Sequence, residues 1–326
     1  MPEQLSLEAI KAPIKDELEQ FERHFKGSVR TRVMLLDKIM GYIVRRKGKQ
    51  MRPMFVLLSA NLCGGIQPST YRAAALIELL HTATLVHDDV VDDAEERRGF
   101  FSLNALWKNK IAVLVGDFLL SRGLLMSLEH DDTQLLKVTS KAVKLMSEGE
   151  LLQIEKARKL NIDEPVYFDV IRMKTASLIA SCTESGATSA TEDATVIEKM
   201  RLFGEHVGMA FQIKDDLFDY GPSKAGKPQG IDLQEKKMTL PLIHTLNQCS
   251  WAERRKLINI VKRHNTSPKH IAYLINFVEE AGGITYSREK MKEYTEAAMA
   301  ILKEFPASGS RQSLEDLVHY TIAREK

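Results

Sequence analysis

The stretch LLHTATLVHDDVVDD, residues 79–93, begins as an apolar helix and ends in carboxylates. Apolar residues recur in its first half at steps of three and four, the period of a helix with one buried face. Six acidic residues follow within positions 88–96. At about 100° per residue, Asp88 and Asp92 would lie about 40° apart on one helix face, with Asp89 close by. So dense a group of like charges needs a cation, and Mg²⁺ suits an all-carboxylate set better than Zn²⁺ does.

The same recurrence of apolar side chains extends along almost the whole chain, and no convincing alternating strand pattern competes with it. Breaks at positions rich in Gly, Pro, Asn and Asp divide it into roughly a dozen helices of ordinary length. Neither a linker-like composition shift nor an internal repeat divides the chain. We therefore predict an all-α fold, a single large helical-bundle domain over residues 1–326 around a central cavity.

The composition fits a well-packed helical protein and narrows the function. The 326 residues carry 46 Lys+Arg against 44 Asp+Glu, a formal net charge of +2, and 44% of them are hydrophobic. The balanced charge argues against a nucleic-acid partner, and the apolar content argues against disorder. Three widely spaced cysteines cannot form a disulfide framework or a zinc site, which favours a reducing, cytoplasmic setting. The most apolar run, 111–126, is interrupted by Asp117 and Arg122, so no transmembrane segment is predicted.

A second acidic stretch, FQIKDDLFD at 211–219, repeats the carboxylate spacing of the first and also follows an apolar lead-in. A solvated acidic helix end would explain either stretch alone. Two stretches with matched approaches favour a shared role, because two inward-facing helices would place them on opposed walls of one cavity.

Clusters of cations accompany the acidic stretches. GKQMRP at 48–53 puts Lys49 and Arg52 one turn apart at a predicted helix start, and Arg97 and Arg98 follow the first acidic stretch. Carboxylates, a divalent cation and arginines together indicate a diphosphate ligand. Simpler explanations stay open, because the first pair would also suit a helix surface and the two arginines would also neutralise the neighbouring glutamates.

By these residues the chain resembles the all-trans polyprenyl diphosphate synthases. The family's motifs occur in the family's order over nearly the whole sequence: GKQMRP at 48–53, DDVVD at 88–92, RRG at 97–99, Gly116-Asp117, Lys174-Thr175, FQIKDD at 211–216 with Asp219, Gly226-Lys227 and DLQEKKMTLP at 232–241. The second acidic motif is DDxxD and not the Asn/Ser/Glu metal motif of terpene cyclases, which favours condensation over cyclisation. One departure is Lys236-Lys237, which stands where the family has Gly-Lys, so the family's glycine is lost and the cation is kept.

The resemblance implies a role for each matched residue. Magnesium ions, three with diphosphate bound, would be held by Asp88, Asp89, Asp92, Asp215, Asp216 and Asp219. The allylic diphosphate would be met by Arg97, Lys174, Thr175, Gln212, Lys227 and Lys237, of which Lys174, Gln212, Lys227 and Lys237 would act in catalysis. Isopentenyl diphosphate would be anchored by Lys49, Arg52, His81 and Arg98. His81 is seven residues before Asp88, so the two would share nearly the same helix face.

The implied reaction is ionisation, condensation and elimination. The cations would stabilise the departing diphosphate, which would also take the proton. No Ser, Cys or His arrangement for nucleophilic catalysis is evident. His87 is adjacent to Asp88 and would point about 100° away from it, so we expect a structural role for this histidine.

Family members that share these segments make long all-trans chains, which implies a C30–C40 product that serves as a quinone side-chain precursor. Ala83 and Thr84 occupy positions where short-chain members carry a bulky aromatic, so the growing tail would pass them. It would stop deeper, at Leu76, Leu79, Leu80 or residues 124–126. The family also implies a homodimer, and a product this apolar would be handed to a membrane.

Other functions remain open on the sequence alone. They are a short-chain synthase that makes farnesyl or geranylgeranyl diphosphate, a terpene cyclase, a non-catalytic subunit of a heteromeric synthase, and a helical scaffold with acidic surface patches. A non-catalytic subunit could dispense with one acidic motif or with the Lys/Arg anchors, whereas this chain keeps all of them.

Overall fold

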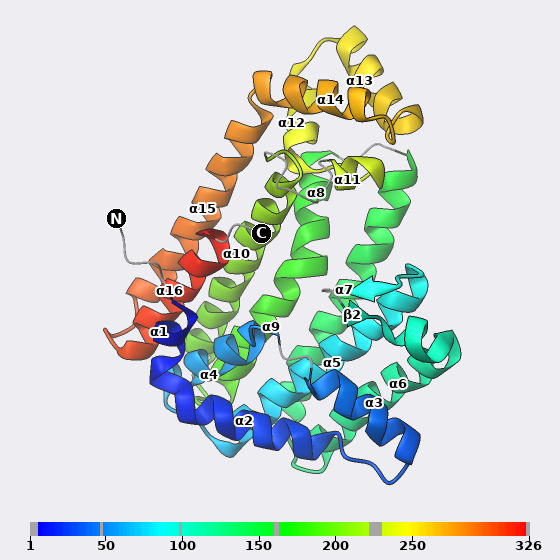
Figure 1. Ribbon diagram of the computed structural model, residues 1–326. Helices are drawn as coiled ribbons and strands as arrows, with labels where there is room; N and C mark the ends of the chain where they lie inside the picture. Colours follow the sequence, from blue (N-terminus) through cyan, green and yellow to red (C-terminus); the bar gives the residue numbers. More distant parts are fainter. Residues whose placement is uncertain (1–5, 46–47, 98–99, 160–162, 222–229, 324–326) are drawn as a thin grey trace. The chain divides into compact units, whose positions relative to one another are not determined.

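The computed structural model describes residues 6–45, 48–97, 100–159, 163–221 and 230–323 (Figure 1). The described chain is helical almost throughout, which confirms the predicted all-α fold. In chain order the helices are α1 (Leu7–Lys11), η1 (Ala12–Ile14), α2 (Lys15–Ser28), α3 (Met34–Arg45), α4 (Met51–Cys63), α5 (Pro68–Val91), α6 (Leu103–Leu128), α7 (Thr133–Lys159), α8 (Glu164–Ile171), η2 (Arg172–Ala176), α9 (Ser177–Thr188), α10 (Ala194–Phe218), α11 (Ile231–Gln234), α12 (Leu240–Gln248), α13 (Trp251–Arg263), α14 (Pro268–Glu280), α15 (Gly283–Lys303) and α16 (Gly309–Ala323).

A short hairpin is the exception to the helical fold in the described part of the chain. β1 (Glu96–Arg97) pairs antiparallel with β2 (Phe100–Phe101). The Tyr42 hydroxyl on α3 donates a 2.8 Å hydrogen bond to the carbonyl of Phe101, which ties the hairpin to that helix. Strands of two residues are too short to show an alternating pattern, so they are not predictable from sequence periodicity.

The chain divides into two compact units, which are described separately. Unit 1 comprises residues 1–143, 181–201 and 305–316, and unit 2 comprises residues 144–180, 202–304 and 317–326. Four of the five boundaries fall inside helices, namely α7, α9, α10 and α16, so each of these helices has residues in both units. A single domain over residues 1–326 stays a prediction.

The main packing in unit 1 joins α5 to α6. Gly123 allows the close approach, because a Cβ on it would lie only 3.0 Å from a methyl group of Leu76 and 3.7 Å from one of Leu80. Beside this pair, α4 is buried on every side over residues 53–60. A helix that is apolar all round belongs in the interior of a protein, and α4 therefore forms part of the core of unit 1.

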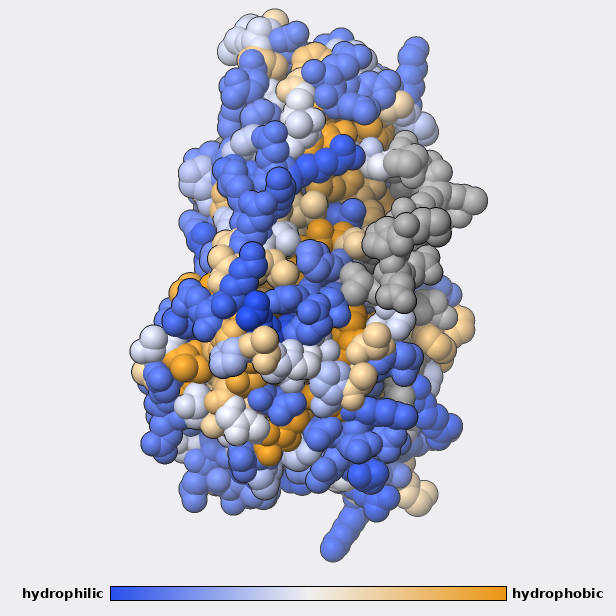
Figure 2. All heavy atoms as spheres, turned by 90° about the vertical axis from the view of Figure 1, so that its left-hand side faces the viewer, coloured by the Kyte–Doolittle hydropathy of each residue, from blue (hydrophilic) through white to orange (hydrophobic). Residues whose placement is uncertain are grey.

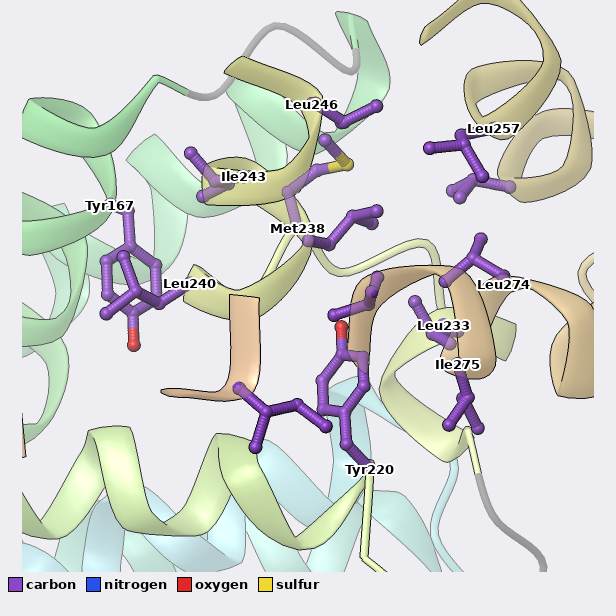
Figure 3. Close-up of a cluster of buried hydrophobic side chains, with 14 of the residues drawn as sticks. Tyr167, Tyr220, Leu233, Met238, Leu240, Ile243, Leu246, Leu257, Leu274 and Ile275 are labelled. Atoms are coloured by element: carbon purple, nitrogen blue, oxygen red, sulfur yellow. The ribbon is translucent and has the colours of Figure 1, made fainter. Parts of the chain in front are cut away.

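The core of unit 2 surrounds α11 and α12. Figure 3 shows Tyr167, Tyr220, Leu233, Met238 and Leu240 within one cluster of buried side chains to which α13 and α14 also contribute. The two hydroxyl groups of Tyr220 and Thr239 share a 2.7 Å hydrogen bond inside this cluster. Burial of this many apolar side chains fixes α11 and α12 in unit 2, because each contributes roughly 1.5–3 kcal/mol by leaving water.

On the face seen in Figure 2, hydrophilic side chains predominate and hydrophobic ones lie in patches between them. Among the described residues, α6 alone is long and apolar enough to cross a membrane by length and composition. Core helices of globular proteins meet the same criteria, and α6 packs along α5. Two charged residues, Asp117 and Arg122, also interrupt α6.

Close packing of α9 on α4 in unit 1 predicts a strong effect of one methyl group. A Cβ on Gly186 would lie 2.4 Å from the carbonyl oxygen of Val56, so Gly186→Ala should lower the free energy of unfolding by about 1–3 kcal/mol. Gly27 on α2 is the matched control, since a Cβ there would meet no atom within 4 Å. Gly27→Ala should stabilise by about 0.5–1 kcal/mol through the better helix propensity of alanine. Urea unfolding measures both, and equal effects of the two changes would contradict this packing.

Candidate functional site

The first acidic motif lies at the carboxyl end of α5 in unit 1. Asp88 and Asp89 belong to the last helical turn, and Asp92 caps the helix with its backbone N–H donating to the Asp88 carbonyl at 2.8 Å. Asp88 and Asp92 are exposed, whereas Asp89 is buried. The carboxyl end of a helix carries a partial negative charge, so carboxylates there are destabilising unless a cation neutralises them.

The second acidic motif repeats this placement in unit 2. Helix α10 ends at Phe218, so Asp215 and Asp216 lie in its last turn and Asp219 follows directly. Burial raises the pKa of Asp216 to about 7, against the opposing effect of two hydrogen bonds to its carboxylate. Burial, and then the charge of Asp232, also raise the pKa of Asp219. Both carboxyl groups are therefore held in surroundings that disfavour an uncompensated negative charge.

The residues of the second motif fit a hard cation such as Mg²⁺. The Asp219 carboxylate accepts hydrogen bonds from the backbone at the start of α11, yet its buried Oδ2 atom has no hydrogen-bond partner among the described residues. A buried oxygen without a donor is an available metal ligand. In the described part of the chain no three His, Cys, Asp or Glu side chains gather closely enough to hold an ion by themselves. Mg²⁺ commonly takes its remaining ligands from water and substrate phosphates, so the sparse protein set agrees with this ion.

A chain of hydrogen bonds surrounds Asp216 in unit 2. The Thr175 hydroxyl donates to Gln212 Oε1 at 2.7 Å, and Gln212 Nε2 donates to Asp216 Oδ1 at 2.9 Å. The Tyr167 hydroxyl donates to Asp216 Oδ2 at 2.8 Å. The structure thus brings together three residues that the sequence analysis selected. Tyr167 was missed, because a single tyrosine in an apolar segment gives no signal of its partner.

The π-helix η2 carries two of the predicted residues, Lys174 and Thr175. Two glycines on neighbouring helices make room for its wider turn. A Cβ on Gly149 of α7 would lie 2.9 Å from the Lys174 nitrogen, and one on Gly208 of α10 would lie 2.4 Å from Ala176 Cα. Single π-turns are rare and frequently occur at functional sites.

The Lys174 ammonium group is held in place by α7. It pairs with the Glu150 carboxylate and donates to Gln153 Oε1 at 2.8 Å. These two partners fix the position of the ammonium group. They were not selected from the sequence, because their proximity to Lys174 depends on helix packing.

The basic residues of unit 1 surround the start of α4. Arg52 lies in the first turn and pairs through two nitrogens with the Glu78 carboxylate of α5, at 2.6 and 3.3 Å. Lys49 is exposed just before the helix. His81 lies three residues after Glu78 and therefore on the same side of α5. Glu78 was missed by the sequence analysis, and it fixes the direction of the Arg52 guanidinium group.

Three of the predicted anion ligands are not described. Arg98 and Lys227 lie outside the described residues, and of Arg97 only the backbone in β1 is described. Their predicted roles stay predictions.

Lys237 lies on the turn after α11. Its ammonium group contacts Glu235 at 2.6 Å and Asp232 at 3.5 Å. Burial lowers its pKa, but the hydrogen bond to Glu235 and the nearby acids outweigh this, so that the pKa is raised overall and the lysine stays charged. Its neighbour Lys236 has φ +60°, in the left-handed region. The family's glycine thus falls at a backbone position that favours glycine, and this chain carries a lysine there.

His87 is engaged by α6, as expected for a structural role. Its Nε2 atom lies 3.3 Å from the carbonyl oxygen of Val113 and 3.6 Å from an Asp117 oxygen. A Cβ on Gly116 would lie 2.1 Å from the same nitrogen. The Gly116-Asp117 motif therefore accommodates His87.

The predicted tunnel residues lie on α5 before the first acidic motif. Ala83 is fully buried, Leu80 is buried, and the Thr84 hydroxyl donates to the His81 carbonyl at 2.9 Å. Three of the candidate stops, Leu76, Leu79 and Leu80, pack against Gly123 of α6, with Leu76 nearest. At this contact the seam between α5 and α6 is closed.

The helical fold and its paired acidic helix ends define the chain as an isoprenoid-synthase-type protein. A family model described as polyprenyl synthetase matches residues 33–278, and the chain belongs to this family of prenyltransferases. An all-trans-nonaprenyl-diphosphate synthase (geranyl-diphosphate specific) of Rhodobacter capsulatus is 36% identical over 97% of each chain. A solved polyprenyl synthase of Caulobacter crescentus, in complex with calcium and isoprenyl diphosphate, superposes with TM-score 0.87 at 30% identity over 98% of each chain. A solved geranylgeranyl pyrophosphate synthase of Bacteroides thetaiotaomicron is similar with TM-score 0.82 and 39% identity over 97% of this chain and 99% of that chain.

The left-handed conformation at Lys236 predicts a stabilising substitution. Lys236→Gly should raise the free energy of unfolding or leave it unchanged, because glycine removes a cost of roughly 1 kcal/mol for a side chain in this conformation. The same replacement at Lys292 inside α15 should cost about 1 kcal/mol. Thermal unfolding of the two variants tests this, and a loss of stability in Lys236→Gly as large as in the control would refute it.

Proposed function

We propose that this protein is a Mg²⁺-dependent all-trans polyprenyl diphosphate synthase that adds isopentenyl diphosphate head to tail to an allylic diphosphate, with a C30–C40 product. The observation that carries the proposal is the repeated placement of three carboxylates at a helix carboxyl end, once in each unit. Carboxylates at a helix carboxyl end are electrostatically unfavourable, and here they occur twice with the same spacing. Both sets therefore indicate the same kind of ligand, a hard cation.

The metal ligands in this proposal are the two aspartate sets, Asp88, Asp89, Asp92, Asp215, Asp216 and Asp219. When bound, the Mg²⁺ ions would neutralise the diphosphate and make it a better leaving group. Three ions are proposed with diphosphate in place. The orphan Oδ2 atom of Asp219 supports its assignment. Calcium and isoprenyl diphosphate in the Caulobacter crescentus relative agree with a divalent cation.

The chain's own cations complete the neutralisation of the allylic diphosphate. Lys174 and Lys237 are each held by acidic neighbours, which orients both ammonium groups before substrate binds. Arg97 and Lys227 are assigned to the same substrate by the family motifs. Thr175 and Gln212 belong to the hydrogen-bond chain that ends on Asp216. Prearranged positive charge stabilises the transition state in which diphosphate leaves, which is the largest catalytic effect expected here.

The remaining steps need no protein nucleophile. Loss of diphosphate leaves an allylic cation, which the double bond of isopentenyl diphosphate attacks. One proton then leaves the new cation and passes to the released diphosphate, so that charge and atoms balance. The protein's part is to exclude water, which would otherwise quench the cation.

Isopentenyl diphosphate is assigned to Lys49, Arg52, His81 and Arg98. The two-point pairing of Arg52 with Glu78 supports this, because it presents a guanidinium group in a fixed orientation next to the start of α4. An oriented guanidinium group matches the oxygens of a phosphate well.

Replacement of one carboxylate in either set tests the metal assignment. Asp88→Asn and Asp215→Asn should each lower kcat by at least about 100-fold, because each removes charge from a metal site while keeping the side-chain shape. Chelation of Mg²⁺ should abolish turnover of the wild type. Asp163→Asn, at the start of α8, is a control on an exposed carboxylate and should leave kcat unchanged. Turnover at the wild-type level in Asp88→Asn or in Asp215→Asn would contradict the assignment of the metal site.

Arg52→Lys separates the two substrate sites. The lysine keeps the charge but loses the two-point geometry, so the KM for isopentenyl diphosphate should rise about tenfold while the allylic KM changes little. Steady-state kinetics with each substrate varied in turn give both constants. An equal rise in both would mean that Arg52 does not distinguish the two anions.

The long product is assigned from two features of α5. Ala83 is small, and the seam between α5 and α6 is closed at the contact of Leu76 and Leu80 with Gly123. Leu76 lies twelve residues before Asp88, about 18 Å along the helix, which leaves a long path for the tail. The nonaprenyl relative agrees with a long product, and the geranylgeranyl relative keeps a short-chain synthase as the alternative.

Two substitutions should move the product length in opposite directions. Ala83→Phe should give active enzyme with C15–C20 products, because the ring blocks the path by overpacking. Leu76→Ala should give products longer than those of the wild type, because it opens the closed seam. Chromatographic sizing of the products checks both. Wild-type product of C15 or C20, or an unchanged length in both variants, would refute the path and leave the family assignment intact.

We further propose a homodimer in the cytoplasm that passes its product to a membrane. Helix α6 exposes apolar side chains along its length, which a second copy would cover: Leu106, Val113, Leu114, Leu124, Leu125 and Leu128. The exposed Asp117 on the same helix favours a protein partner over lipid. All three cysteines are free thiols, which suits a reducing compartment.

A further inference from the structure

Three large apolar side chains are exposed side by side where α2 turns into α3 in unit 1. Val33, Met34 and Leu35 are 60%, 86% and 48% exposed. We name residues 26–38 the α2–α3 tip. Single exposed apolar residues are ordinary, but three in sequence at the start of α3 are not explained by packing within the unit.

The tip is also strongly basic. Its sequence KGSVRTRVMLLDK contains four cations and one acid, a net charge of 4 − 1 = +3. Lys26, Arg30, Arg32 and Lys38 are all exposed. Since the whole chain has a net charge of only +2, this short segment concentrates positive charge around its apolar side chains.

Contacts with the rest of unit 1 hold the tip in shape. The Arg122 side chain of α6 donates to the Ser28 carbonyl at 2.7 Å, and the buried Val29 follows directly. The Asp37 backbone N–H donates to the Val33 carbonyl at 2.9 Å as α3 begins. These contacts fix the backbone on both sides of the three apolar side chains.

The tip is fastened to α6 beside the closed end of the proposed product path. Arg122, which holds Ser28, is the residue before Gly123, and Gly123 is where Leu76 and Leu80 close the seam. A tail that passed this contact would arrive next to the tip. A role of the tip in product release rests on the proposed function. The binding of the tip to another surface does not depend on that function.

We propose that the α2–α3 tip docks on an anionic lipid surface, with Val33 and Met34 inserted among the lipids and Arg30, Arg32 and Lys38 on the headgroups. Apolar side chains ringed by cations are the combination that interfacial membrane binding requires. A second copy fits the tip less well. In a dimer with its twofold axis at the tip, the tips of the two copies would face each other, and each carries a charge of +3.

Vesicle sedimentation of the full-length protein tests this. The wild type should bind vesicles that contain phosphatidylglycerol and should bind weakly to vesicles of phosphatidylcholine alone. Val33→Ser/Met34→Ser should weaken binding about tenfold through lost apolar insertion. Arg30→Gln/Arg32→Gln should weaken it about 30-fold, from about 1 kcal/mol per charge.

The control variants are Leu151→Ser, an equally exposed leucine on α7, and Lys262→Gln/Arg263→Gln at the end of α13. Both should bind vesicles as the wild type does. Tip variants that bind like the wild type, or controls that lose as much affinity, would overturn the proposal. A change of oligomeric state in the tip variants by sedimentation velocity would also overturn it, since the tip would then be an interface between copies.

Synthase assays in detergent separate this proposal from the proposed function. The tip variants should form polyprenyl diphosphate in detergent at the wild-type rate. A wild type that forms no such product but binds vesicles through the tip contradicts the proposed function alone. A wild type that is active but does not bind anionic vesicles contradicts the docking proposal alone.

Discussion

The position of carboxylates at the carboxyl ends of α5 and α10 is the constraint on which the rest of the site depends. Each helix end carries a partial negative charge, and each receives three aspartates with the same spacing. Without a cation, both arrangements cost free energy through repulsion and, at Asp216 and Asp219, through burial. Packing in each unit must therefore hold in place groups that would otherwise separate or become protonated.

In unit 2, that support comes from a wide helical turn and a buried cluster. The π-helix η2 fits between Gly149 and Gly208, which have no side chains to obstruct it. It places Thr175 at the start of the hydrogen-bond chain to Asp216. On the other side, the cluster around Tyr220 and Leu233 anchors α11, whose backbone N–H groups hold Asp219 (Figure 3). A site of fixed geometry results, and its unsatisfied oxygen is available to a ligand.

The sequence predicted what depends on local spacing and missed what depends on distant contacts. Helical periodicity and the repeated DDxxD spacing gave the all-α fold and both acidic helix ends, because side chains four residues apart share a helix face. Glu78 and Tyr167 went unnoticed, since each becomes part of the site only through a partner on another helix, 26 and 49 residues away. The π-turn at Lys174 was equally invisible, because it arises from packing against two glycines. The sequence shows that Lys236 stands where the family has a glycine. Only the backbone shows that this lysine adopts a left-handed conformation.

Thermal unfolding in the presence of Mg²⁺ and inorganic diphosphate tests most directly whether the acidic helix ends bind a metal–diphosphate complex. We expect a small shift in Tm with either ligand alone and a larger shift with both. Mg²⁺ neutralises the carboxylates and the diphosphate, and diphosphate supplies metal ligands that the protein lacks. At 100 times the dissociation constant the stabilisation should reach about 2.7 kcal/mol. The same experiment on Asp88→Asn/Asp215→Asn should show no added shift. An unchanged Tm in the wild type, or an equal shift in the double variant, would contradict the account.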